Sequence, residues 1–217
     1  MSEWNYWWAD GGQAAQPRYR QFQHNGFSVG CGAVAWALLI GWADRQADDG
    51  NPRWSKRWGL YRQNGGTGAD ARAPIAMNEG IRNVIREISD HIGTFKPPLS
   101  SQGAVWPNKM SRVYEYLRIR TGTGYRTRSR AYFSRSIRRM VSDEIRSRQS
   151  PAVVGIGVLR HYALAYGYAE ETQIVRILGK PIGEKVVSRH FCVNQGHGSN
   201  LGEWISTRAW FGGCLIP

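Results

Sequence analysis

The sequence predicts an α+β fold in which helices come first and an antiparallel sheet comes second. Between residues 31 and 147, apolar side chains recur every three or four residues, which is the spacing of one face of a helix. After Pro151 the pattern changes to short β-branched or aromatic runs separated by glycines and charged turns, which is typical of strands. The length of 217 residues suits one domain with a substantial core.

The composition excludes several classes of protein. Hydrophobic residues make up 41% of the chain and charged residues 21%, a globular balance that excludes a disordered chain or a low-complexity fibre. The longest apolar stretch, around residues 33–43, is shorter than the roughly 18 residues that a membrane-spanning helix needs, so we expect no integral membrane segment. The first ten residues have no basic head followed by an apolar run, so no secretory signal peptide is expected.

The first half of the chain is predicted to be mainly helical. Residues 1–30 show no sustained periodicity and are expected to form an irregular arm that is rich in aromatic residues. Residues 31–44 are apolar nearly all round, which predicts a buried central helix. Four further helices are expected near residues 54–61, 79–91 (with Asn78 as its cap), 108–119 and 134–147.

Short strands complete the predicted fold. They are expected near residues 152–158, 162–168, 174–178, 186–194 and 203–207. We find no internal repeat, and because the length hardly allows two independent domains, the chain is predicted to form a single domain over residues 1–217. Its parts are the arm (1–30), a mainly helical lobe (31–150) and an antiparallel β-sheet lobe (151–217), with the join near Pro151.

Cys31 is a candidate nucleophile because it stands at the amino end of the predicted central helix. There the unpaired backbone N–H groups and the positive end of the helix dipole are expected to lower the thiol pKa and favour the thiolate. Gly30 and Gly32 on either side let substrate and backbone approach closely. The alternative is that Cys31 is a small apolar residue that helps to bury its helix.

His161 and Asn194 are candidate partners of this thiol. His161 opens a predicted strand 130 residues after Cys31, and Asn194 ends another strand. If the central helix packs on the sheet, the imidazole can reach the thiol and hold it as an ion pair. The Asn194 amide can then accept a hydrogen bond from the imidazole and fix its orientation. A histidine taken alone is more often a polar residue with a structural partner.

Three segments contain these residues: GCGAVAWALL, HYALAYGY and FCVNQGHGSNLGEW. Together they resemble the papain-like cysteine peptidases, most closely the bacterial C39-like and streptopain-like branches. The resemblance implies a papain-like fold with a cleft between two lobes and a Cys31–His161–Asn194 triad. The chain departs from the family at Gly-Cys-Gly-Ala, where plant papains have Cys-Gly-Ser-Cys-Trp, and at Gln-Gly-His-Gly after Asn194, where streptopain-like chains tend to have Trp-Gly-Trp-Gly.

The same resemblance implies a glutamine that stabilises the developing oxyanion together with the Cys31 backbone N–H. Gln23, eight residues before Cys31, is the first choice, and Gln21 is the rival. Both also fit as polar residues of a loop. No cofactor and no metal are expected, because His190, Cys192 and His197 lack a second pair of ligands at site spacing. Cys192 and Cys214 could form a disulfide, which the sequence cannot test.

The function that this resemblance implies is that of a thiol peptidase that cleaves a protein or peptide substrate through a thioester acyl-enzyme. The likeness to bacterial branches suggests a bacterial toxin or effector domain with a cognate inhibitor or immunity protein. Such a domain would be secreted or delivered into a target cell without a signal peptide, or otherwise be cytoplasmic. Acyl transfer or deamidation on a protein glutamine uses the same chemistry as far as the thioester and stays open.

Charge suggests a non-enzymatic alternative. The net charge is +13, and 24 of the 29 basic residues are arginine, which grips carboxylates and phosphates with a planar fork. The region from Arg112 to Arg148 holds eleven arginines and three acidic residues, with tyrosines interleaved. It can be a solvated helix face, or a docking surface for an anionic membrane, a nucleic acid or an acidic protein. If it binds nucleic acid, the chain can be an Arg-rich nucleic-acid-binding module.

Overall fold

The computed structural model of this chain describes all residues except 1, 55–72, 122–125, 158–160, 179 and 199–200. The predicted helix near residues 54–61 therefore lies almost wholly outside the described residues. The other predicted helices are present, and Asn78 caps one of them by accepting a hydrogen bond from the Ile81 N–H at 2.9 Å. The helices are α1 (Cys31–Asp48), α2 (Glu79–His91), α3 (Val113–Thr121), which follows the 3-10 turn Met110–Arg112, and α4 (Ser134–Arg148).

An antiparallel sheet forms the middle of the molecule. Its strands follow the order β4-β9-β5-β6-β7-β8, and β1 pairs with the outer part of β6. A separate two-stranded hairpin, β2–β3, precedes α1. The mixed fold of helices and an antiparallel sheet agrees with the sequence prediction. The strands are β1 (Ser2–Trp8), β2 (Gln23–His24), β3 (Phe27–Ser28), β4 (Arg126–Ala131), β5 (Ala152–Ile156), β6 (His161–Ile177), β7 (Lys180–Asn194), β8 (Glu203–Ser206) and β9 (Phe211–Ile216).

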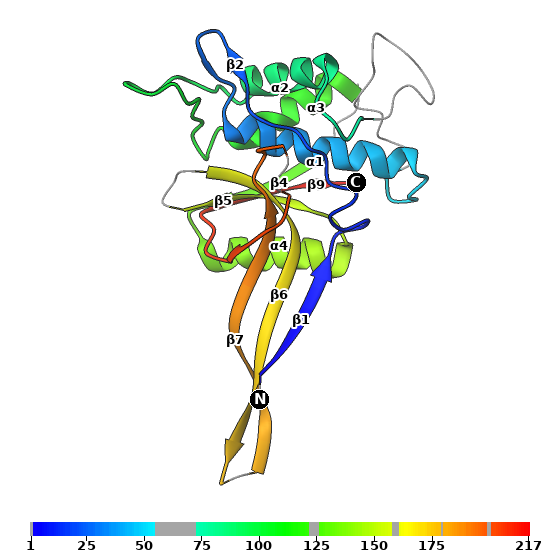
Figure 1. The fold of residues 1–217 in the computed structure, drawn as a ribbon, viewed down its shortest axis with the longest axis vertical. Coiled ribbons are helices and arrows are strands. Elements are labelled where there is room, and N and C mark those ends of the chain that lie inside the picture. The colour runs from blue at the N-terminus through cyan, green and yellow to red at the C-terminus, as the bar shows by residue number, and fades with distance from the viewer. Residues whose placement is uncertain (1, 55–72, 122–125, 158–160, 179, 199–200) are drawn as a thin grey trace.

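Helices cover both faces of the body of this sheet (Figure 1). The larger core joins α1, α2 and α3 to one face, and a second core joins α4 to the other. Neighbouring residues of β5 show the division, since Val153 belongs to the first core and Ala152 and Val154 belong to the second. A strand that is covered on both sides is apolar at every position, which is why this segment contains a continuous apolar run.

Helix α1 lies at the centre of the larger core, between the sheet and α2. Its side chains are buried on every side from Gly32 to Asp44, and Trp36, Leu38 and Trp42 are completely inaccessible to solvent. Burying an aliphatic or aromatic side chain of this size contributes about 1.5–3 kcal/mol to the free energy of folding. The helix is therefore a fixed support for the residue at its amino end, Cys31.

We expect Leu38→Ala to lower the free energy of unfolding by about 2–5 kcal/mol, because it leaves a cavity inside a core that is closed on all sides. Ile119→Ala is the matched control, since this α3 side chain is 68% exposed and its truncation removes little buried surface. Guanidinium-induced unfolding of both variants measures the difference. A Leu38→Ala variant as stable as Ile119→Ala would contradict the buried position of α1.

The prediction of an irregular arm is wrong, and so is the assignment of all strands to the second half. Residues 2–8 form β1, in which Trp7 packs on Tyr168 while Trp8 packs on Trp204. Strand β4 also comes from the first half. The two strands predicted at 162–168 and 174–178 are one long strand, β6, which pairs with β7 in a ribbon that projects away from the helices (Figure 1).

Candidate active site

Cys31 is the first residue of α1 and is partly exposed. The turn before it depends on Gly30, whose φ of 82° is in the left-handed region that side chains disfavour. A Cβ at Gly30 would also lie 3.0 Å from the Gly103 carbonyl oxygen, closer than side-chain carbons normally approach. The loop therefore reaches the helix by a path that only glycine allows, and it leaves Cys31 at the helix end as the sequence predicts.

The first residues of β6 lie against this thiol. The backbone N–H of Tyr162 donates a hydrogen bond to Cys31 Sγ at 3.3 Å, although 131 residues separate the two in sequence. His161 is the residue before Tyr162 and begins the strand. The packing of α1 on the sheet thus brings the predicted nucleophile against the backbone of the residue that follows the predicted base. Among the described contacts, no hydrogen bond joins the thiol to the imidazole directly.

The imidazole of His161 is held from its far side by a backbone carbonyl. Its Nε2 lies 3.0 Å from the Gln195 carbonyl oxygen. A carbonyl can only accept a hydrogen bond, so Nε2 carries the proton and donates it, and Nδ1 of the neutral ring keeps its lone pair. His161 also stacks on the exposed ring of His197, with 5.5 Å between centroids and 17° between planes.

Asn194 lies one residue before this carbonyl, and its side chain makes no described contact with His161. It is fully buried. Its Nδ2 donates to the Pro17 carbonyl at 2.8 Å, and its Oδ1 accepts from the Gly196 N–H at 3.0 Å. These two bonds fix the turn that presents the Gln195 carbonyl. The sequence therefore places Asn194 near the site, but the group that touches the imidazole belongs to its neighbour.

Gly196 packs this turn directly against α1. Its φ is 73°, and a Cβ there would lie 2.8 Å from Val34 Cγ1, one turn into the helix that begins at Cys31. The glycine therefore serves both the turn and the close contact. This contact, together with the Tyr162 hydrogen bond to Cys31, locks the loop, the strand and the helix end into one arrangement.

The electrostatic surroundings of the pair differ from the sequence expectation. Burial raises the pKa of the Cys31 thiol above its ordinary value, and the N–H groups of Tyr162, Cys31 and Gly32 lower it by less than burial raises it. Burial also lowers the pKa of His161, against the hydrogen bond to Gln195, and a charge on His197 lowers it further. Both shifts favour the uncharged form at neutral pH, a neutral Cys31 thiol and a neutral His161 imidazole, where the sequence predicts a thiolate.

The two glutamines predicted as oxyanion donors differ in exposure and in their contacts. Gln23 is exposed on the β2–β3 hairpin, where it pairs with Ser28. Gln21 is half-buried, and its Oε1 accepts from Ser28 Oγ at 2.8 Å. The same hydroxyl accepts from the Gly30 N–H at 3.3 Å. Gln21 is thus connected to the turn that leads into Cys31, whereas the described contacts of Gln23 stay within the hairpin.

The remaining candidate groups lie away from this site. All three cysteines are free; Cys192 hydrogen-bonds the Tyr166 hydroxyl, and Cys214 belongs to the core beneath α4, so they do not form a disulfide with each other. Among the described residues, no group of three or more His, Cys, Asp or Glu side chains is placed to hold a metal ion. None of the described helices is long and apolar enough to cross a membrane.

Sequence reasoning could not identify three backbone groups that shape the site: the Tyr162 N–H, the Gln195 carbonyl and the Pro17 carbonyl. Every residue type except proline carries the same N–H and C=O groups, so residue identity gives no signal for them. A partial signal existed in the Asn-Gln-Gly sequence at 194–196, because Asn followed by Gly two positions later often marks a turn closed by a side-chain hydrogen bond.

The fold and the site together define a mixed α/β protein with a helix-terminal thiol that accepts a hydrogen bond from the backbone next to an oriented imidazole. No family model matches the sequence, and no curated protein matches it. A solved structure of similar overall architecture is a fragment of prointerpain A from Prevotella intermedia. It has a TM-score of 0.49 and 14% sequence identity, and the match covers 96% of this chain and 74% of that chain. A likeness of this size does not bear on chemistry, which rests on the site itself.

Proposed function

We propose that this protein is a thiol hydrolase of the papain-like kind that cleaves amide bonds in peptides, with Cys31 as nucleophile and His161 as base. The observation that supports this most is the hydrogen bond from the Tyr162 N–H to Cys31 Sγ, because it fixes the start of β6, and with it His161, at the thiol. The resemblance of the segments GCGAVAWALL, HYALAYGY and FCVNQGHGSNLGEW to papain-like cysteine peptidases points to the same chemistry.

The proposed reaction begins from the neutral pair. His161 Nδ1 takes the thiol proton while Cys31 Sγ attacks the substrate carbonyl carbon. As the C–N bond breaks, the imidazolium gives this proton to the leaving nitrogen, and a thioester remains. Water then attacks the thioester carbon and passes a proton to His161. When the C–S bond breaks, the proton returns to sulfur and a carboxylic acid leaves.

The developing negative charge on the carbonyl oxygen needs hydrogen-bond donors. The Cys31 backbone N–H at the helix end is one of them. For the second we propose Gln21 in place of Gln23, because Ser28 holds the Gln21 Oε1 and so leaves its Nε2 hydrogens to donate. Gln23 lies exposed on the hairpin, without such an anchor among its described contacts.

A peptide library tests this function because it offers many different amide bonds to the protein at once. The library, made by digesting a cell proteome, is incubated with the parent protein or with Cys31→Ala, and the products are weighed by mass spectrometry. We expect shortened peptides with new termini from the parent alone. Replacement of glutamine amides by acids, or joined peptides, would reassign the site to deamidation or acyl transfer. No Cys31-dependent product of any kind would overturn the proposal.

Asn194 acts in this scheme as a positioning residue for the Gln195 carbonyl. We expect Asn194→Ala to lower kcat by about 10-fold or more with little change in KM, because the imidazole loses its fixed orientation. Since the variant also loses two buried hydrogen bonds, its free energy of unfolding should fall by about 1–3 kcal/mol. Asn194→Asp keeps an acceptor for the Gly196 N–H and should recover part of kcat. A purely structural role would lower stability and leave kcat per folded molecule unchanged.

A further inference from the structure

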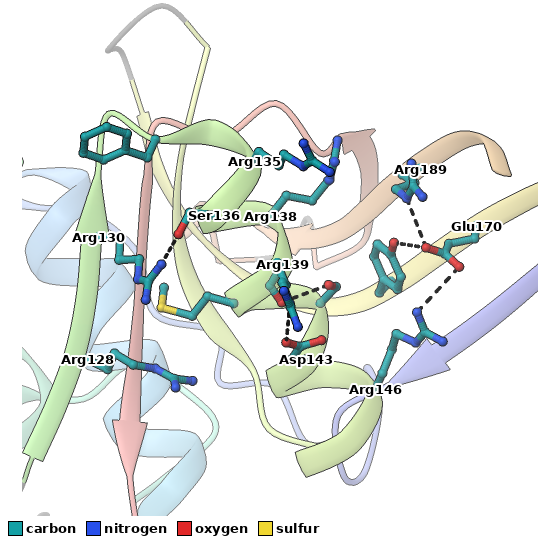
Figure 2. Close-up of a pocket in the computed structure, with 14 residues that line it drawn as sticks. Arg128, Arg130, Arg135, Ser136, Arg138, Arg139, Asp143, Arg146, Glu170 and Arg189 are labelled. Carbon is teal, nitrogen blue, oxygen red and sulfur yellow. Dashed lines mark hydrogen bonds and ion pairs between the residues drawn. The ribbon is translucent and has the colours of Figure 1, made fainter.

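A concave site that contains none of the residues of the candidate active site lies on the face of the sheet opposite to α1. It is an open groove of about 840 Å³ lined by residues of β4, α4, β6 and β7. Figure 2 shows Arg128 and Arg130 on one side, Arg135, Arg138, Arg139 and Arg146 along the helix, and Arg189 with Glu170 on the other side. The guanidinium groups are spread along the groove and do not converge on one point, which suits an extended ligand.

The groove has more positive charge than its own carboxylates can balance. Seven arginines line it, against Asp143 and Glu170. Glu170 is shared by Arg189 at 3.1 Å and Arg146 at 3.6 Å, and Asp143 lies 3.8 Å from Arg139. Within the part of the chain that the structure describes, these contacts use both carboxylates.

Three arginines of the groove have no carboxylate partner there. Among the described contacts, Arg135 and Arg138 pair with no acidic residue, and Arg130 binds only the Ser136 hydroxyl. Successive turns of α4 rise by about 5.4 Å, so Arg135 and Arg138 present their charges roughly one turn apart. A row of unpaired guanidinium groups at this spacing can bind successive phosphates of one strand, each by a bidentate contact.

Exposed aromatic rings stand at the end of the same groove. Phe133 lines it and is 73% exposed, and the neighbouring Tyr132 is 63% exposed. Tyr132 has a φ of 67°, an unfavourable conformation for a bulky residue, which the hydrogen bond from its N–H to the Trp210 carbonyl at 2.8 Å holds in place. The turn before α4 thus holds two rings out in solvent beside the arginines.

We infer that this groove binds single-stranded nucleic acid, with the arginines on the phosphates and Phe133 and Tyr132 stacked on bases. An acidic protein fits less well, because Met140 and Tyr168 are buried and Phe133 projects into solvent, so the groove offers an exposed ring for stacking and no buried apolar pocket for an anchoring side chain. The site is separate from Cys31, since the sheet lies between them (Figure 1).

Fluorescence anisotropy with a labelled 20-nucleotide oligo(U) strand tests this inference. For four to seven phosphate contacts, a plot of log Kd against the logarithm of the salt concentration should rise with a slope of about 3 to 5. The double variant Arg135→Glu/Arg138→Glu should bind at least about 10-fold more weakly, with a smaller slope. Both side chains lie on the surface of α4, and circular dichroism checks that the variant is folded.

Arg118→Glu/Lys109→Glu is the matched control, because it makes the same change in net charge at exposed positions near α3. It should bind like the parent, and so should Cys31→Ala. Equal weakening by both double variants would mean that net charge alone attracts the strand, and would overturn the inference. So would displacement of the strand by poly-glutamate at the same charge concentration, which would assign the groove to an acidic protein.

Discussion

Replacing Cys31 by serine should lower kcat/KM for peptide hydrolysis by on the order of 10³-fold or more. A serine hydroxyl at the same place ionises far less readily than a thiol, and His161 alone activates it poorly in a site arranged for sulfur. KM should change little, because the side chain keeps its size and its hydrogen bond from the Tyr162 N–H. Initial rates on a fluorogenic peptide chosen from the library experiment measure both constants.

Cys192→Ser is the control for this measurement. It also removes one thiol, but from a buried position where a hydroxyl can still bond to Tyr166. We expect it to retain the parent rate. Should Cys31→Ser also retain that rate, the thiol would be a packing residue of α1 and the hydrolase proposal would fail. The inference that the groove at α4 binds nucleic acid would stand in that case, because it uses no residue of the Cys31 site.

Local sequence signals predicted the helices well because each signal is contained within the helix itself. The apolar stripe of α2 and its Asn78 cap are examples, since both depend on residues within one or two turns. Strand β5 was predicted for a similar reason, as a short apolar run rich in β-branched residues that follows Pro151 and suits a strand covered on both faces.

The sequence did not predict strands β9 and β4, because these strands depend on packing with distant parts of the chain. β9 contains Gly212 and Gly213, which in isolation indicate a turn. In the fold these glycines make room for other side chains, because a Cβ on Gly212 would lie 2.7 Å from Met140 Cε and one on Gly213 would lie 2.8 Å from the Trp36 ring. β4 is an edge strand of alternating arginines, and its composition is that of a loop.

The candidate site shows the same contrast between features that the local sequence signals and features that depend on distant packing. Cys31 and His161 were predicted from residue type and position, and the packing of α1 on β6 places Cys31 against the backbone of Tyr162, the residue after His161. What residue types could not predict is burial, which sets the protonation of the pair. A helix terminus lowers a thiol pKa, yet partial burial of Cys31 raises its pKa by more than the N–H groups of Tyr162, Cys31 and Gly32 lower it. That balance depends on neighbours from distant segments of the chain.

Because the pair starts neutral, His161 should act as a general base, and the pH dependence of hydrolysis should show it. Only the neutral imidazole can take the thiol proton, so kcat/KM should fall about tenfold per pH unit as pH drops through the His161 pKa. Burial holds this pKa below the ordinary value of about 6.5, so the midpoint of the acid limb should lie below that pH. His161→Ala should lose on the order of 10²–10⁴-fold in kcat/KM and lose this acid limb.

His197→Ala is an independent test of which group titrates, because it should move the pKa of His161 in a known direction. The exposed His197 ring stacks on His161, and its charge lowers the pKa of His161. Removing it should therefore raise the pKa of His161 and move the acid limb to higher pH, while the rate at about pH 8 stays near that of the parent. A limb that moved to lower pH, or that survived in His161→Ala, would show that another group titrates. The base would then have to be sought elsewhere around Cys31.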